Sequence, residues 1–140
     1  MIKSFRGEYN FLSNFYNAPI TYYGITYRNN ESAFQAQKLL NNEEKKAFCN
    51  LTGKESKFKG RRVKMRDDWN QVKDQIMYEI IFLKFMQNKD LKAKLLATGD
   101  ELIQENNTWN DTYWGVCNGK GENKLGKILM KVRSYIKNLK

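Results

Sequence analysis

The second half of the chain carries hydrophobic residues at three- and four-residue steps, which is the spacing of an amphipathic helix. One such stripe begins after Asp67 and Asp68, either of which is a candidate N-cap. Its apolar positions are Trp69, Val72, Ile76, Ile80 and Leu83. A second stripe predicts a helix at the end of the chain, with apolar positions Leu125, Ile128, Leu129, Val132, Ile136 and Leu139. Between them, a helix is expected from Asp90 to Thr98, with Gly99 as its left-handed C-cap.

Strands are expected mainly near the beginning of the chain. Residues 20–22 and 25–27 are rich in β-formers and flank Tyr23-Gly24, so that this segment predicts a hairpin. Two further short strands are expected at residues 101–105 and 113–117.

Two helices are expected after the hairpin. The first begins near Asn29 or Asn30, has Glu31 in its first turn and runs through Leu40, and a shorter one covers residues 43–51. The chain has no repeat, low-complexity tract or flexible linker. We therefore expect an α+β fold, mostly helical with a few short strands, in a single domain over residues 1–140.

Composition removes several kinds of chemistry. The 140 residues include no histidine, which excludes catalytic triads that use an imidazole and zinc sites that use histidine ligands. Cys49 and Cys117 are the only cysteines, too few for a disulfide scaffold or a four-cysteine metal site. We expect no metal and no cofactor. No apolar run approaches the ~20 residues that span a bilayer, and the start does not resemble a signal peptide, so a soluble cytoplasmic protein is expected.

Charge is unevenly distributed along the chain. The formal net charge is +10, with +2 in residues 1–30, +6 in residues 31–66, −4 in residues 67–111 and +6 in residues 112–140. Two basic segments around an acidic one suit a protein that attracts an anionic ligand, such as a nucleic acid or a phosphorylated sugar. A solvated basic surface without a ligand is the alternative.

Polar residues gather on one face of the first predicted helix. Glu31, Gln35 and Lys38 fall on that face, because seven residues return to within ~20° of the starting direction. A carboxylate, an amide and an ammonium in a row are a candidate site, and a stripe that faces solvent is the alternative.

Aromatic residues mark two further candidates. Trp69 is either the first core anchor of its helix or a platform on which a base stacks. The segment 105–115 places two tryptophans and Asp111 among turn-forming residues, and this favours a functional loop. Residues 10–16 follow neither period, and their amides and aromatics suit a loop that contacts another molecule.

Two segments suggest phosphate contacts. Residues 119–126 are rich in glycine and precede a helix, where backbone N–H groups bind anions, although the Gly-Lys-Ser/Thr order of a Walker A motif is missing. A flexible turn is the alternative. Residues 57–66 hold six basic residues in ten, which indicates either a solvated face or a contact with phosphate.

Several groups of residues, spaced along nearly the whole chain, carry a family resemblance. In chain order they are Phe11-Leu12-Ser13-Asn14-Phe15, Glu31 with Phe34-Gln35-Ala36-Gln37-Lys38, Gly60-Arg61, Trp69 with Val72 and Met77, Lys84-Phe85, Leu95-Leu96-Ala97-Thr98-Gly99-Asp100, Asp111 with Tyr113-Trp114-Gly115, and Gly121-Glu122-Asn123-Lys124-Leu125-Gly126 with Leu129-Met130 and Arg133. This set resembles the NADAR family, the YbiA-like proteins. One departure is Glu55-Ser56-Lys57-Phe58-Lys59, which replaces the usual small residues before Gly-Arg.

The resemblance implies a compact, mostly helical α+β domain that acts as an N-glycosidase. Family members are linked to the hydrolysis of a ribose C–N bond, in phosphorylated aminopyrimidine intermediates of riboflavin synthesis or in ADP-ribose attached to guanine. The family's acidic residue falls on Glu31, its tryptophan on Trp69 and its aspartate on Asp111. The candidate substrate-binding residues are Asn14, Phe15, Gln35, Arg61, Trp69, Trp114, Gly115 and Asn123.

The chemistry of such a bond agrees with these residues. Cleavage builds positive charge on the sugar, which Glu31 or Asp111 would stabilise as carboxylates. Lys38 would be a charge partner of Glu31, or a nucleophile that attacks C1 and forms a Schiff base with the opened ribose. The expected partner is a phosphorylated ribose N-glycoside, with ADP-ribosylated nucleic acid as one form of it. The alternative is a nucleotide- or nucleic-acid-binding module without catalytic activity.

Overall fold

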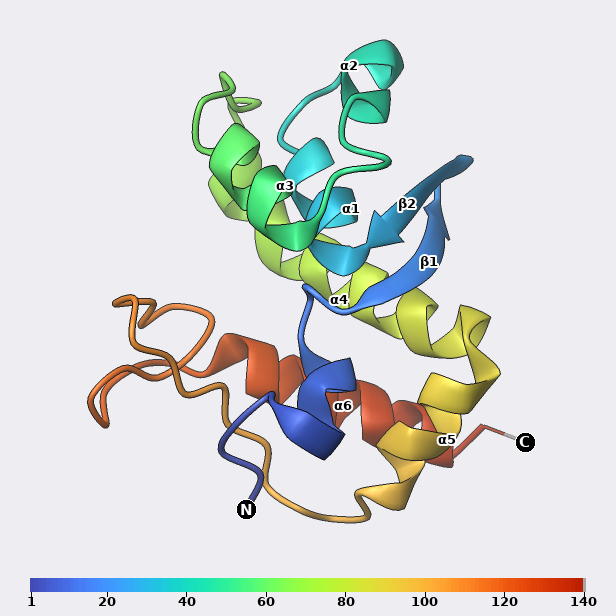
Figure 1. The fold of residues 1–140 in the computed structure, drawn as a ribbon, viewed down its shortest axis with the longest axis vertical. Helices are drawn as coiled ribbons and strands as arrows, with labels where there is room; N and C mark the ends of the chain where they lie inside the picture. Colours follow the sequence, from blue (N-terminus) through green and yellow to red (C-terminus); the bar gives the residue numbers. More distant parts are fainter. Residues whose placement is uncertain (140) are drawn as a thin grey trace. The chain divides into compact units, whose positions relative to one another are not determined.

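The structure is a computed structural model that describes residues 1–139, and the chain in it divides into two compact units (Figure 1). The first, here called the central unit, is continuous and comprises residues 14–89. The second, the terminal unit, combines residues 1–13 with the chain from residue 90 onward.

The predicted hairpin opens the central unit. Strands β1 (Asn17–Tyr22) and β2 (Ile25–Asn29) pair in antiparallel fashion as a two-stranded sheet. Tyr23 and Gly24 connect them with φ angles of 49° and 80°. Two successive left-handed residues are typical of a tight turn whose twist matches that of the flanking strands. The hairpin prediction is therefore confirmed.

Helix α1 (Asn30–Ala36) follows β2 directly and ends earlier than the sequence predicts. Asn29 caps it, because its side chain accepts a hydrogen bond from the backbone N–H of Ser32. After Ala36 the N–H groups of Gln37 and Lys38 donate to carbonyls three residues back, so the helix tightens and stops. The expectation that it continues through Leu40 is wrong, because the chain turns there toward α2 (Asn42–Lys46), whose N-cap is Asn41.

Helix α3 (Gly53–Gly60) was not expected from the hydrophobic pattern, and α2 stops short of the predicted residue 51. No apolar stripe runs along α3. Its beginning is instead stabilised by a capping box, in which the side chain of Thr52 accepts from the Glu55 N–H and the side chain of Glu55 accepts from the Thr52 N–H.

Helix α4 (Trp69–Gln87) is the long helix predicted from the stripe that begins at Trp69, and it lies along the hairpin (Figure 1). The Gln87 side chain accepts from the Thr21 N–H and donates to the Thr21 carbonyl, at 2.8 and 2.9 Å. The buried face is turned slightly from the predicted one, because Val72 and Leu83 are only half-buried. The buried positions are Trp69, Ile76, Met77, Ile80, Ile81, Lys84 and Phe85.

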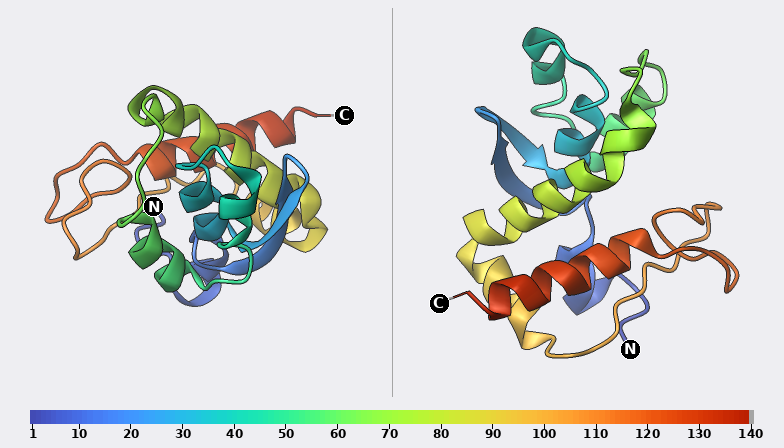
Figure 2. Two further views of the ribbon diagram at one scale, coloured as in Figure 1. Left: turned by 90° about the horizontal axis from the view of Figure 1, so that it is seen from above. Right: turned by 180° about the vertical axis from the view of Figure 1, so that it is seen from behind.

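The terminal unit contains a 3-10 helix, η1 (Gly7–Leu12), and two α-helices, α5 (Lys89–Ala97) and α6 (Lys124–Lys137), the latter red in Figure 2. Gly99 has a φ of 62° and ends α5 as predicted. The predicted strands at 101–105 and 113–117 are wrong. Ile103, Val116 and Cys117 each form an isolated bridge, since no partner segment runs beside them for more than one residue.

None of the helices in the described part of the chain is long and apolar enough to cross a lipid bilayer.

Candidate active site

The carboxylate of Glu31 is buried, although it lies in the first turn of a helix. Glu31 is 9% exposed and Gln35 is 7% exposed. Gln35 Nε2 donates a hydrogen bond to Glu31 Oε2 at 2.7 Å. The interpretation of this face as a solvated stripe is therefore wrong, because both side chains are enclosed by the protein.

Gly60, the last residue of α3, lies against the Gln35 side chain. A Cβ atom at position 60 would overlap Gln35 Oε1 and would lie 2.6 Å from its Cδ. Glycine at position 60 therefore leaves the room that this amide occupies. The Gln35 Oε1 atom is buried and has no hydrogen-bond partner within residues 1–139.

Lys38 joins this group from the turn after α1. Its Nζ donates to the Gly60 carbonyl at 3.0 Å. The pKa of Lys38 is lowered mainly by burial; the charges of Arg61 and Lys73 lower it further, whereas Glu31 raises it. The structure thus brings Glu31, Gln35 and Lys38 together as predicted, although Lys38 lies beyond the end of the helix.

Asn14 fixes the beginning of α1. It is 8% exposed, its carbonyl accepts from the Glu31 N–H at 3.0 Å, and its Oδ1 accepts from Asn30 Nδ2 at 3.3 Å. Phe15, which follows, is 42% exposed, and its ring lies close to Gly53, where a Cβ would come within 2.6 Å of the ring. Asn14 thus contacts α1 beside Glu31, whereas Phe15 lies at the start of α3.

Trp69 and Arg61 occupy opposite environments in the central unit. Trp69 is 5% exposed, and its ring centroid lies 5.0 Å from that of Phe34, so it serves as a core anchor. Its role as a stacking platform stays a prediction. Arg61 is exposed and directly follows α3, where its charge acts on Lys38.

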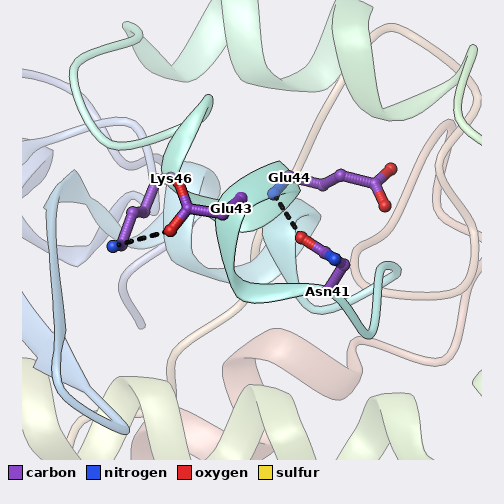
Figure 3. Close-up of polar contacts among 4 residues, drawn as sticks. All are labelled: Asn41, Glu43, Glu44 and Lys46. Atoms are coloured by element: carbon purple, nitrogen blue, oxygen red, sulfur yellow. Dashed lines mark hydrogen bonds and ion pairs between the residues drawn. The ribbon is translucent and has the colours of Figure 1, made fainter.

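The carboxylates of α2 contrast with Glu31 (Figure 3). Glu43 pairs with Lys46 at 3.1 Å, and the Glu44 N–H donates to the Asn41 side chain at 3.0 Å. The Glu44 side chain itself is exposed and lies away from these contacts. Glu44 therefore offers a matched surface position for substitutions at Glu31.

Asp111, in the terminal unit, organises the turn that follows it. Its Oδ1 accepts from the N–H groups of Tyr113 and Trp114, at 3.1 and 2.9 Å. Asn107 holds the Asp111 backbone from the other side: its Nδ2 donates to the Asp111 carbonyl and its Oδ1 accepts from the Asp111 N–H. This carboxylate is half-buried and shapes the loop that contains Trp114 and Gly115.

Gly115 is buried where two segments meet closely. A Cβ there would lie 2.6 Å from Glu105 Oε1 and 2.7 Å from Asn107 Nδ2. The preceding Trp114 is half-buried and packs edge-on against Tyr113, with ring centroids 4.9 Å apart. A substrate contact by either residue stays a prediction.

The glycine-rich segment before α6 is a structural turn. Asn123 has a φ of 52°, and its side chain accepts from the Glu105 N–H and donates to the Ile103 carbonyl. The N–H groups of residues 122–125 donate to carbonyls of residues 112–115. These four amides are therefore not available to a phosphate, and the phosphate-loop interpretation of them is wrong. A substrate contact by Asn123 stays a prediction.

Sequence reasoning did not single out Lys84 as a functional candidate. It is 1% exposed on the buried face of α4, and burial lowers its pKa to about 7. Its Nζ lies 5.7 Å from the centroid of the Tyr16 ring. The sequence does contain an indication that Lys84 is buried, because this residue falls seven positions after Met77, on the buried face of the same helix.

The predicted site residues thus form two groups. Asn14, Phe15, Glu31, Gln35, Lys38, Arg61 and Trp69 belong to the central unit. Asp111, Trp114, Gly115 and Asn123 belong to the terminal unit.

Comparison with known proteins finds relatives that are named N-glycosidases and riboflavin biosynthesis proteins. N-glycosidase YbiA of Shigella boydii serotype 4 is 36% identical over 133 residues, covering 92% of this chain and 82% of that protein. Riboflavin biosynthesis protein VVA0006 of Vibrio vulnificus is 34% identical over 133 residues, covering 92% of this chain and 36% of that protein. The NMR structure of Escherichia coli YbiA matches with a TM-score of 0.84 and 36% identity, over 98% of this chain and 85% of that one.

This structural likeness confirms the predicted mostly helical α+β fold. The family model of the NADAR domain matches residues 3–137, a range that runs through both units. This chain is a member of the NADAR family.

Proposed function

We propose that this protein is a hydrolase that cleaves the N-glycosidic bond between a ribose and a nitrogen, without a cofactor. The observation that carries the proposal is the buried carboxylate of Glu31, which is held by Gln35 and lies in the field of Lys38. The names of the relatives, N-glycosidase and riboflavin biosynthesis protein, support the same reaction.

Glu31 suits this chemistry because of its surroundings. As the C–N bond breaks, positive charge builds on C1 and on the ring oxygen of the sugar. A carboxylate held in a buried site stabilises that charge more strongly than one in water, since solvent does not screen it. In the simplest form, water adds to C1 on the face that Glu31 covers, and the nitrogen leaves with a proton.

Lys38 offers a second form of the same reaction. Its Nζ would bond to C1 while the C–N bond breaks and the leaving nitrogen takes a proton. One Nζ proton goes to the leaving nitrogen, and the other moves to the ring oxygen as the sugar ring opens and the imine forms. Water then adds to the imine carbon and releases the lysine amine and the sugar aldehyde. The lowered pKa of Lys38 increases the fraction of free amine, and the side chain is half-buried rather than enclosed.

Borohydride reduction during turnover, followed by peptide mapping, separates the two forms. We expect a reduced adduct on Lys38, and none in Lys38→Arg. Lys84 serves as the internal comparison, because its amine is enclosed at 1% exposure. Full turnover with no trapped adduct would leave only the direct attack by water.

The substrate that we propose is a phosphorylated ribose N-glycoside. Arg61 is exposed next to Lys38 in the basic segment 57–66, which would hold a phosphate near the carboxylate. Both an aminopyrimidine riboside of riboflavin synthesis and ADP-ribose attached to guanine, free or in nucleic acid, have this chemistry. Both cysteines are free thiols, which fits the cytoplasmic location that we propose.

Mass spectrometry of released base or ADP-ribose, from a panel that contains both substrate classes, tests this function. We expect release from at least one class. Binding of the ligands without release of base from any of them would instead support a nucleotide- or nucleic-acid-binding module. One observation favours that alternative. The guanidinium carbon of Arg62 lies 3.6 Å from the centroid of the exposed Phe58 ring, beside other basic residues.

A further inference from the structure

The Gln35 amide has one orientation in the structure. A carboxylate accepts hydrogen bonds and donates none, so the group that faces Glu31 Oε2 at 2.7 Å is the amide nitrogen Nε2. The amide oxygen Oε1 therefore points the other way, against Gly60. There it is buried and accepts no hydrogen bond within the described chain.

An enclosed acceptor without a partner costs free energy. The Oε1 atom is also closed off from a ligand, because the backbone of Gly60 covers it. In this orientation the amide nitrogen donates to Glu31, while the amide oxygen accepts no hydrogen bond. Buried acceptors without a partner are uncommon in folded proteins, so this one calls for an explanation, and the hydrogen bond that the same amide donates to Glu31 supplies one.

Helix α3 is fixed against α1 by further polar contacts. Lys38 Nζ donates to the Gly60 carbonyl at 3.0 Å, and the Ser32 and Ser56 hydroxyls lie 2.8 Å apart. The Ser32 hydroxyl also donates to the Leu51 carbonyl at 2.9 Å. These contacts are made just before α3, at its middle and at its last residue, so they hold the helix, and Gly60 with it, against α1.

We propose that Gln35 is a positioning residue for Glu31 and not a ligand of the substrate, and that Gly60 is the surface that holds it in place. The role as a positioning residue rests on the proposed function of Glu31. It revises the sequence-based prediction that Gln35 binds substrate. The amide donates to one carboxylate oxygen and so fixes the direction in which the carboxylate meets the sugar.

Gln35→Met tests the proposal, because it keeps the length of the side chain and removes the donor. We expect kcat to fall about ten- to hundredfold, the cost of losing a hydrogen bond to a charged group, with KM within about twofold of the wild type. Gln71→Met, at an exposed position of α4, is the matched control and should leave both constants unchanged. A raised KM with an unchanged kcat would show that Gln35 binds substrate, and would overturn the proposal.

A second readout needs no substrate. Loss of the donor makes the ionised carboxylate less favourable, so the NMR titration midpoint of the Glu31 side-chain carbon should lie at higher pH in Gln35→Met than in the wild type. An unchanged midpoint would overturn the positioning role. If the wild type hydrolyses no ribose N-glycoside, the proposed function fails while this titration still decides whether Gln35 acts on Glu31.

Gly60→Ala gives the same information should Gln35→Met not fold. The added methyl group displaces the amide while every donor remains in the chain. We expect the same direction of change in kcat and in the titration midpoint. Wild-type values for both would show that Gly60 does not hold the amide in place.

Discussion

At the scale of single residues, the site depends on charges that act on one amine. Glu31 favours the charged form of Lys38, whereas burial and the charge of Arg61 oppose it. These effects have opposite signs, so substitutions at Glu31 and Arg61 should move the reactivity of Lys38 in opposite directions.

Glu31→Gln removes the attractive charge, which should lower the pKa of Lys38 further and increase the fraction of free amine. Arg61→Gln removes a repulsive charge and should raise this pKa. Amine labelling of Lys38, measured by mass spectrometry across pH, should be faster in the first variant and slower in the second. Glu44→Gln is the surface control. Equal labelling rates in all three variants would show that neither charge acts on Lys38.

Sequence reasoning predicted the identities in this group but not their contacts. The seven-residue spacing correctly placed Glu31, Gln35 and Lys38 together. It could not show that Glu31 and Gln35 are buried, because Gln35 is enclosed by Gly60 of α3, which lies 25 residues further along the chain. The sequence also could not predict that Gly60 leaves room for the Gln35 amide, because this depends on the position of a side chain on another helix.

At the scale of elements, α3 is the helix that hydrophobic periodicity failed to predict. Its exposed residues are mostly charged, and its contacts with α1 are polar, so no apolar stripe marks it. The Thr52-x-x-Glu55 capping box was the available signal. The two predicted strands are wrong for the opposite reason: the local sequence favours strands there, but the residues near Ile103 and Val116 form single bridges rather than ladders.

Gly60→Ala should destabilise the protein by about 1–3 kcal/mol, as expected when a group is added to a filled space. Removing the obstructing amide should relieve this cost, so Gly60→Ala combined with Gln35→Ala should be more stable than the sum of the two single changes predicts. Urea denaturation of the four proteins measures the coupling. Simple additivity would mean that the two residues are not in contact.

Asn123→Ala should lower the free energy of unfolding by about 1–3 kcal/mol, because the Glu105 N–H and the Ile103 carbonyl both lose a partner. Asn118 is a matched control: it has a similar left-handed φ of 54° but is exposed and makes no such contacts. Thermal unfolding should therefore show a larger loss for Asn123→Ala than for Asn118→Ala. Equal losses would mean that only the backbone conformation matters.

At the scale of the whole molecule, Lys84 couples stability to pH. Its pKa is about 7 in the folded protein and near the ordinary value of 10.5 when unfolded, so the unfolded chain binds the extra proton between these values. The free energy of unfolding should therefore rise with pH above about 7, by up to about 1.4 kcal/mol per pH unit. The raised pKa of Tyr27 acts with the opposite sign, and only above about pH 10.

Urea denaturation between pH 7 and 9.5 checks this linkage. Lys84→Met should flatten the rise, because it removes the titrating group and keeps an apolar side chain of similar length. Lys89→Met, at the exposed first residue of α5, should preserve the slope of the wild type. Identical slopes in the wild type and Lys84→Met would mean that the buried amine does not lose its proton in this range.

The proposed role of the buried Glu31 carboxylate is to stabilise the positive charge that forms on the sugar as the ribose C–N bond breaks. Its most direct test is the rate of base release by Glu31→Gln, compared with Glu44→Gln, on the substrate that the wild type turns over. We predict a loss of at least about a hundredfold for Glu31→Gln, with substrate binding retained, and a wild-type rate for Glu44→Gln. A Glu31→Gln protein that releases base at the wild-type rate would show that this carboxylate does not take part in the cleavage.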